Sequence, residues 1–438
     1  MKGFNKCLLS ILLLSFLLSI GYSFYFKIKP QVDARAYDVI AQNIVNGNGY
    51  REALDMPVEM DGVVVRAGPV YEYFLAGVYK VFGHSYPNVW VLQAFLHAIS
   101  AYLIYLICLL IFANSENKEK IALVAAAIFG FYPDLIEISA MLMTETLYLF
   151  LICLSLYLFF LYIKDNKIQT LTIFTIIFGL TSLTRPPVFF LLPVILFYLL
   201  KKRQFARTLI FGILLVAVLT PWTVRTYQVY GKAMPFGAGG AYNFWIGNHL
   251  GGSGEQEPGP ELMNYFNNHS VLDSYNKSNA EFKSFIVDHP QDFVQTTFSR
   301  INKYFSILRP MGFWFYSSGW RQLLFVMSSA VFSLFVLIAS FGGILQTVKL
   351  KEKSLHYLLA FTIITPLIIF ITVVETRYRF QIYPFLAIFA AYFINSFMQN
   401  KKVWWSALWV ALVLILANGL LDGLLNLAHF KEKLAPYL

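Results

Sequence analysis

Long apolar runs set the strongest limit on how this chain can fold. A run of about 20 apolar residues crosses the roughly 30 Å hydrocarbon core of a bilayer as a helix, which satisfies its own backbone hydrogen bonds without water. The pattern therefore predicts an all-α polytopic membrane protein with about 11 transmembrane helices. The runs lie near residues 7–26, 88–112, 121–133, 140–163, 168–184, 186–200, 208–222, 322–346, 355–374, 380–398 and 403–421.

Composition agrees with a membrane protein and argues against nucleic-acid binding. Only 13% of the 438 residues are charged and 58% are hydrophobic, whereas a soluble domain is roughly one-quarter charged. The net charge of +10 comes from short Lys and Arg clusters between apolar runs rather than from one basic face. Cys7, Cys108 and Cys153 lie within apolar runs without metal-ligand spacing, so we interpret them as packing thiols.

The basic clusters predict the orientation of the chain. The run after MKGFNK is long enough to span and lacks a small-residue cleavage site, which favours a retained signal-anchor helix over a cleaved secretory signal. With a cytoplasmic N-terminus, the short internal loops are NSENKEK, KDNK, KKRQFAR, TVKLKEK and QNKK, all basic as the positive-inside rule requires. We therefore predict a multi-pass protein of the plasma (inner) membrane. The rule leaves the C-terminal tail HFKEKLAPYL outside.

Two segments are too long and too polar to be turns, and both are predicted to be extracytoplasmic. The first polar segment (residues 27–87) carries amphipathic aromatics typical of short interfacial helices. The second polar segment (residues 223–320) begins Gly-rich and continues amphipathic, which predicts a mobile loop followed by surface helices, a candidate acceptor or lid region. Since no soluble domain is evident, residues 1–438 are interpreted as one transmembrane domain.

Arginines on the predicted outer side run against the positive-inside bias, and a charge at the membrane edge requires a partner. The planar, multi-donor guanidinium suits phosphate, and a lipid phosphate is the natural anion at that depth. We therefore predict an anion site at the outer interface. The outer arginines are Arg35, Arg51, Arg66, Arg185, Arg225, Arg377 and Arg379.

Carboxylates gather at the same level: Asp33, Asp38, Asp134, Glu137, Glu145 and Glu375. Because carboxylates repel phosphate, at least one is predicted to have another task, such as a general base that takes a proton from an acceptor hydroxyl. A neighbouring anion and partial burial would raise the pKa of that base. The alternatives are a helix N-cap for Asp33, and hydrated turn acids for Asp134 and Glu137.

Motifs along nearly the whole chain are similar to those of one family. They include VDARAYDVIAQNIVNGNGY, VRAGPVYEYFLAGVYKVFG, FYPDLIEISAMLMTETLY, GLTSLTRPPVFFLLP, PWTVRTYQVYG and ETRYRFQIYPFLAIFAAY. In this order they resemble the GT-C membrane glycosyltransferases, specifically the bacterial relatives of dolichyl-phosphate-mannose protein mannosyltransferases and of the lipid A aminoarabinose transferase.

This resemblance implies a GT-C-like fold and inverting transfer of a sugar from a polyprenyl-phosphate carrier to an acceptor outside the cytoplasm. By motif position, Asp33 is the catalytic base, and the carrier phosphate is held by Arg66, Arg185, Arg377 and Arg379. Asp38 is interpreted as a structural neighbour of Asp33. The candidate lining residues of a sugar or acceptor pocket are Tyr37, Asp38, Asp134, Glu145 and Asn248.

One departure from the family pattern limits what the resemblance implies. Asp33 is followed by Ala34 where protein mannosyltransferases carry two adjacent acids, so no metal site is assigned and a divalent metal is optional. The acceptor, whether glycan, lipid or protein, is left open. The rival functions are a transporter, a lipid flippase or a polysaccharide-assembly protein without transferase chemistry. A transporter should carry ionisable groups near the bilayer midplane, whereas here they gather at the outer ends.

Overall fold

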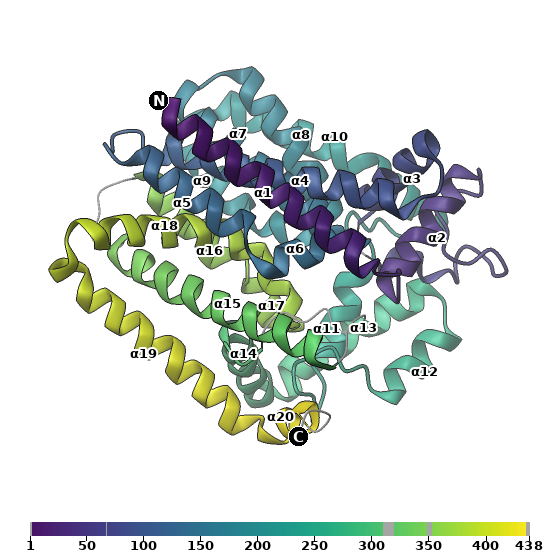
Figure 1. The fold of residues 1–438 in the computed structure, drawn as a ribbon. Helices are drawn as coiled ribbons and strands as arrows, with labels where there is room; N and C mark the ends of the chain where they lie inside the picture. Colours follow the sequence, from purple (N-terminus) through teal and green to yellow (C-terminus); the bar gives the residue numbers. More distant parts are fainter. Residues whose placement is uncertain (1, 67, 310–318, 348–352, 435–438) are drawn as a thin grey trace.

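The computed structural model describes residues 2–66, 68–309, 319–347 and 353–434, and its regular elements are helices. The long helices pack side by side into a bundle (Figure 1), in which α4 contacts α1, α5 and α7, and α18 contacts α5, α15 and α19. The bundle helices are α1 (Lys2–Phe26), α4 (Tyr86–Ile111), α5 (Lys118–Gly130), α6 (Pro133–Ser139), α7 (Thr144–Asp165), α8 (Ile168–Thr184), η2 (Pro186–Leu191), α9 (Leu192–Lys201), α10 (Phe205–Tyr230), α15 (Gly319–Thr347), α16 (Lys353–Ile364), α17 (Leu367–Ile371), η3 (Thr376–Ile382), α18 (Tyr383–Gln399) and α19 (Lys401–Leu425), followed by α20 (Leu427–Leu434).

Eight helices in the described ranges are long and apolar enough to cross a membrane, or nine if the bent pair α5–α6 forms one span. The all-α, polytopic membrane architecture is therefore confirmed, whereas the predicted count of about 11 is not. The bend of 56° falls where Pro133 begins α6, because proline cannot donate the backbone hydrogen bond that would continue α5. Two further apolar helices, Ile168–Thr184 and Pro186–Lys201, are shorter.

Parts of three sequence-based predictions lie outside the described residues. These are 310–318 of the second polar segment, 348–352 of the basic loop TVKLKEK, and the last four residues of the tail. The positive-inside orientation stays a prediction.

The first polar segment forms α2 (Asp33–Val45), η1 (Gly62–Val65) and α3 (Val70–Phe82). The buried residues of α2 form one face of the helix, and this face packs on α3. The rings of Tyr37 on α2 and Tyr71 on α3 meet there edge to face, with centroids 5.6 Å apart. This contact places the start of α2 just beyond the end of α1, at the end of the bundle away from the N-terminus (Figure 1).

The second polar segment forms α11 (Gly239–Gly247), α12 (Pro260–Asn268), α13 (Val271–Asp288) and α14 (Pro290–Phe305). The predicted Gly-rich loop is thus partly wrong, since residues 239–247 are helical. Trp245 and Ile246 are buried on α11, and this tertiary packing outweighs the poor helix propensity of the glycines. Figure 1 shows α11, α12 and α13 gathered near α2.

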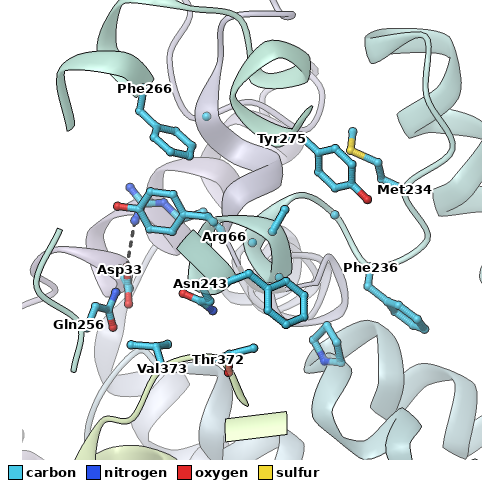
Figure 2. A pocket seen from close by; sticks show the side chains of 18 of the residues that line it. Asp33, Arg66, Met234, Phe236, Asn243, Gln256, Phe266, Tyr275, Thr372 and Val373 are labelled. Carbon is cyan, nitrogen blue, oxygen red and sulfur yellow. Dashed lines mark hydrogen bonds and ion pairs between the residues drawn. The ribbon is translucent and has the colours of Figure 1, made fainter. Parts of the chain in front are cut away.

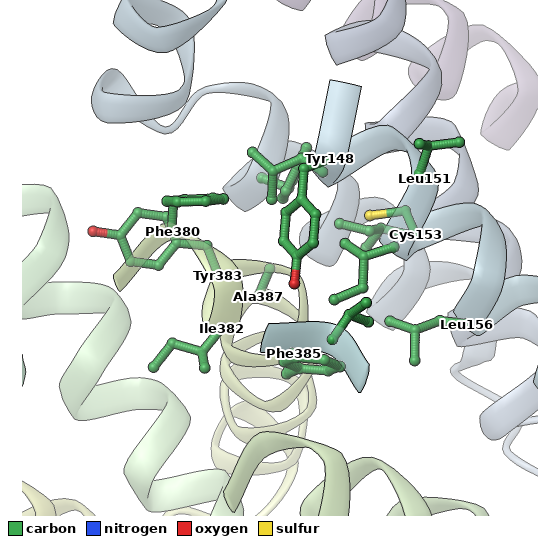
Figure 3. Packing of buried hydrophobic residues seen from close by; sticks show 14 of the residues in the cluster. Tyr148, Leu151, Cys153, Leu156, Phe380, Ile382, Tyr383, Phe385 and Ala387 are labelled. Atoms are coloured by element: carbon green, nitrogen blue, oxygen red, sulfur yellow. The ribbon is translucent and has the colours of Figure 1, made fainter. Parts of the chain in front are cut away.

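Buried aromatic and aliphatic side chains form the core beneath this end of the bundle (Figure 3). Tyr148 on α7 meets Phe380 on η3 edge to face, with ring centroids 5.8 Å apart. Cys153 and Cys108 are free and buried, as expected of packing thiols, whereas Cys7 is free but exposed on α1. The core therefore anchors η3, which carries two of the predicted arginines.

We predict that Gly247 is required for the close approach of α11 to the segment before η3. A Cβ at Gly247 would lie 1.8 Å from the carbonyl oxygen of Thr372, so Gly247→Ala should lower the free energy of unfolding by about 1–3 kcal/mol. The midpoint of thermal unfolding in lipid nanodiscs measures this. Gly240→Ala on the same helix is the control, because a Cβ there meets no heavy atom within 4 Å. Equal midpoints for the two variants would refute the assignment.

Candidate active site

A cavity of about 1160 Å³ opens where the two polar segments meet the ends of the core helices. Its walls come from the start of α2, the loop between α2 and α3, the turn before η2, helices α11 to α13, and the chain around η3. Figure 2 shows Asp33 and Arg66 hydrogen-bonded on one side, with Phe266 and Tyr275 from the second polar segment also facing the cavity. The two polar segments, distant in sequence, thus share one site.

Asp33 lies in the first turn of α2 and faces the cavity. Its Oδ1 accepts a hydrogen bond from Nη1 of Arg66 at 2.9 Å, and its Oδ2 accepts one from Nη1 of Arg377 at 3.1 Å. The N-cap position belongs to Val32, and no side-chain capping bond is made there, so the N-cap alternative for Asp33 is wrong. With 23% of its side chain exposed, Asp33 is open to a molecule in the cavity.

The two arginines set the protonation state of Asp33. Burial raises the pKa of this carboxyl group, but the charges of Arg377, Arg66 and Arg185, with the hydrogen bond from Arg377, lower it by more, so its pKa lies below the ordinary 3.8. The sequence-based expectation of a raised pKa is therefore not met by the protein alone. Asp33 is ionised at neutral pH.

Arg66 and Arg377 are each held by a second carboxylate. Arg66 binds Glu52 through two bonds, from Nε at 3.0 Å and from Nη2 at 2.9 Å. Arg377 donates from Nε to Glu375, two residues earlier in the chain. These bonds fix both guanidinium groups beside Asp33, with the planar geometry that also suits a phosphate.

Arg185 completes a set of three arginines that line the cavity. It follows α8, and its Nη1 donates to Oε1 of Glu145 at 2.7 Å and to Oγ1 of Thr144 at 2.9 Å. Its guanidinium carbon lies 5.1 Å from the ring centroid of Phe380, a favourable cation–π distance. Glu145 is fully buried behind Arg185 and does not line the cavity, so its predicted pocket role becomes that of a partner to Arg185.

Arg379 does not join this set, although it is only two residues from Arg377. Its side chain is 1% exposed, and it donates to the backbone carbonyls of Ser306, at 3.1 Å, and of Arg309. The 3₁₀ geometry of η3 turns the two arginines to different sides. The prediction that Arg379 contacts phosphate is therefore corrected, because its donors hold the end of α14.

Asp38 and Asp134 also lie away from the cavity lining. Asp38 accepts hydrogen bonds from the hydroxyls of Tyr79 at 2.6 Å and Tyr86 at 2.9 Å, so it is a structural neighbour of Asp33 rather than a pocket residue. Asp134 is fully buried and is bonded to the hydroxyls of Ser329 and Tyr383. The prediction of a hydrated turn acid is wrong for Asp134.

The structure also differs from the predictions for Glu137 and Asn248. Glu137 is 2% exposed, so the prediction of a hydrated turn acid is wrong for it as well. Asn248 lies outside the lining, is 1% exposed, and its Oδ1 accepts a bond from Arg300 at 2.7 Å. Its amide also donates to the Ile371 carbonyl at 3.1 Å, so the predicted acceptor contact is replaced by a role in joining α11 to the chain before η3. Of the predicted pocket residues, Tyr37 lines the cavity.

Sequence reasoning missed Glu52 and the contribution of α11 to α13. Glu52 belongs to no motif, and the only available signal was that an outer arginine such as Arg66 requires an anionic partner. The sequence marks the second polar segment as a candidate acceptor or lid region. It gives no signal for which residues of α11 to α13 line the cavity, because packing of their buried faces sets their place.

The described residues hold no group of three or more His, Cys, Asp and Glu side chains placed to share a metal ion. Around Asp33, the nearby carboxylates Glu52, Glu145 and Glu375 are each bonded to an arginine. The residues present do not fit a metal centre, and we derive no step through one.

Comparison with known proteins places this arrangement in context. The sequence model of the dolichyl-phosphate-mannose-protein mannosyltransferase family matches residues 66–224. The structure of ArnT from Cupriavidus metallidurans bound to undecaprenyl phosphate has 13% sequence identity and a TM-score of 0.50, over 96% of this chain and 65% of that one. The apo oligosaccharyltransferase of Archaeoglobus fulgidus has 14% identity and a TM-score of 0.51, over 95% of this chain and 55% of that one.

No curated protein sequence matches the chain. The chain spans 55% and 65% of the lengths of the two solved structures, and at such low identity the similarity establishes the fold. The GT-C-like fold that the motifs indicate is thereby confirmed.

We predict that Arg377→Gln raises the pKa of Asp33, because Arg377 is the arginine whose charge lowers that pKa most. Carbodiimide modifies protonated carboxyl groups, so labelling of Asp33, followed by mass spectrometry of the full-length protein, reports its titration. In the unchanged protein labelling should begin only below the ordinary range of an Asp; in the variant it should begin at higher pH. Arg379→Gln, which does not contact Asp33, is the control. Identical labelling profiles for all three proteins would disprove the assignment.

Proposed function

We propose that this membrane protein of GT-C-like fold is an inverting glycosyltransferase, which moves a hexose or pentose from a polyprenyl-phosphate carrier to an acceptor hydroxyl. The observation that carries the proposal is the Asp33 carboxylate held between Arg66 and Arg377 in a cavity at one end of the bundle. The family match and the undecaprenyl phosphate bound in the ArnT structure support a lipid-linked donor.

The three arginines are proposed to hold the donor phosphate. Arg66, Arg185 and Arg377 come from three separate parts of the chain and converge on the cavity. Each already has a carboxylate partner, so an arriving phosphate shares these guanidinium donors with Asp33, Glu52, Glu145 and Glu375. The carboxylates keep the arginines in place, and the phosphate takes up the remaining donor positions.

Asp33 is proposed to act as general base. An acceptor hydroxyl gives its proton to Asp33 while its oxygen forms a bond to the anomeric carbon from the face opposite the phosphate. The bond between that carbon and the phosphate oxygen breaks, its electron pair stays on the phosphate, and polyprenyl phosphate leaves. The arginines stabilise the charge that develops there, so the leaving group requires no acid catalyst.

Donor binding also prepares Asp33 for its task. In the protein alone, Arg66 and Arg377 keep the pKa of Asp33 low, which makes the carboxylate a weak base. A phosphate that draws on the same arginines raises that pKa by adding negative charge and by sharing their hydrogen bonds. The arrangement therefore favours donor binding before the acceptor loses its proton.

The proposed location is the extracytoplasmic side of the plasma membrane. The cavity lies just beyond Phe26, at the end of α1 away from the N-terminus. If the basic N-terminus is cytoplasmic, as the positive-inside rule predicts, the cavity faces the other side.

Asp33→Asn should lower the rate of sugar transfer by about 10²- to 10⁴-fold, the usual contribution of a general base. Mass spectrometry of surface glycans, lipids and glycoproteins from cells expressing either protein identifies the product and measures its loss. Binding of undecaprenyl phosphate, measured by native mass spectrometry, should persist because the arginines are unchanged. Asp55→Asn is the matched control, since Asp55 is exposed in the same polar segment, on the loop after α2, and does not line the cavity. Unchanged transfer in Asp33→Asn would eliminate the general-base assignment.

We expect two different acid limbs in the pH dependence of transfer. The kcat/KM for donor reports the free enzyme, where the pKa of Asp33 lies below 3.8, so its acid limb should fall below that pH. The kcat reports the complex with bound phosphate, so its acid limb should lie at higher pH. Steady-state kinetics in nanodiscs between about pH 3 and about 9 test this. A kcat limb at or below that of kcat/KM would show that phosphate does not draw the arginines away from Asp33.

A further inference from the structure

The cavity has two sides that differ in charge. Its charged lining residues come from the first polar segment and from the ends of core elements; they are Asp33, Glu52, Asp61, Arg66, Arg185 and Arg377. The lining residues between 234 and 279, all within the described part of the second polar segment, include no charged side chain. We call this second set the neutral wall. The proposed phosphate chemistry uses only the charged side.

Aromatic rings form one component of the neutral wall. Phe266 on α12 packs edge to face against Tyr242 on α11, with ring centroids 4.5 Å apart, and both line the cavity. Tyr275 on α13 adds a third ring, and Figure 2 shows it and Phe266 facing the cavity. Three different helices thus present aromatic surface to the same space.

Side-chain amides form the other component. Asn243 and Asn267 line the cavity, and neither side chain hydrogen-bonds to another residue in the described ranges. Gln256 accepts one bond, from the Tyr378 hydroxyl at 3.4 Å, which leaves its amide NH₂ group available. Asn279 uses one donor on the Tyr275 carbonyl at 2.8 Å. The wall therefore holds amide donors and acceptors that the protein itself does not saturate.

This combination matches the chemistry of a neutral saccharide. A sugar ring has apolar C–H faces that pack on aromatic rings, while each hydroxyl both donates and accepts hydrogen bonds, as an amide side chain does. A charged headgroup or ionised peptide side chain placed here would lose water without gaining a counterion, which is costly. The neutral wall therefore discriminates against charged molecules.

The size of the cavity allows a second molecule beside the donor headgroup. Its volume of about 1160 Å³ exceeds the roughly 300–1,000 Å³ typical of sites for one small ligand. The arginines restrict the donor phosphate to the charged side. The neutral wall is then left for whatever supplies the attacking hydroxyl to Asp33.

We propose that the neutral wall binds a neutral, hydroxyl-rich saccharide as the acceptor, so that the acceptor is a glycan rather than an anionic lipid headgroup or a charged peptide. The assignment of this saccharide as the acceptor rests on the proposed function. Binding of a saccharide to the neutral wall can be measured independently of catalysis.

The experiment is saturation-transfer NMR on the full-length protein in nanodiscs. The probes are methyl glycosides of neutral hexoses and a neutral disaccharide, compared with a lysine-containing tripeptide. Mannose 1-phosphate, which the arginines of the charged side should bind, is the positive control for that side. The neutral saccharides should bind, and Asn243→Leu and Phe266→Leu should each weaken that binding roughly fivefold or more, as expected for the loss of one good contact.

Asn264→Leu is the matched control, because Asn264 is exposed on α12 and does not line the cavity. Thermal unfolding confirms that all variants are folded, and folded lining variants that bind like the control would overturn the proposal. So would binding of the lysine-containing tripeptide in preference to the neutral saccharides. If saccharides bind as expected but no glycosyl transfer occurs, the proposed function fails while the neutral wall stands. If transfer occurs to a charged acceptor and the saccharides do not bind, the reverse holds.

Discussion

The pairing of Asp33 with Arg66 and Arg377 is the interaction on which the site depends. It joins the start of α2, the loop before α3, and η3, segments that are far apart along the chain. Charges at the edge of a membrane are costly without partners, and here each of the three cavity arginines has a carboxylate within hydrogen-bond distance. The same pairing joins the first polar segment to η3 and gives the cavity its charged side.

The two sides of the cavity divide the proposed chemistry. Arginines that already share carboxylates respond to an added phosphate by redistributing hydrogen bonds, which couples donor binding to the basicity of Asp33. The neutral wall from α11 to α13 contributes no charge. In the proposed reaction, donor and acceptor are therefore distinguished by the kind of surface that each contacts, and the two surfaces meet at Asp33.

Predictions from the sequence agree with the structure for residues whose neighbours are close in the chain, and for charged residues that require a partner of opposite charge. The apolar runs coincide with the bundle helices because burial of a hydrophobic segment depends mainly on its own composition. Arg66, Arg185 and Arg377 reach one cavity, as arginines that require an anion should. The errors concern polar residues whose partners are distant: Arg379 binds the end of α14, and Asp134 binds Ser329 and Tyr383. A charge pattern alone does not distinguish such buried hydrogen-bonded groups from groups that face a cavity.

By itself, the sequence determined the membrane architecture, the two polar segments and the candidacy of Asp33, because hydropathy, charge bias and motif order are local properties of the chain. Only the tertiary structure decided that Asp33 is ionised, that Glu52 holds Arg66, and that α11 to α13 face the arginines across one cavity. A pKa and a binding surface both depend on which groups lie within a few ångströms of one another. That proximity arises from packing between segments that sequence order keeps apart.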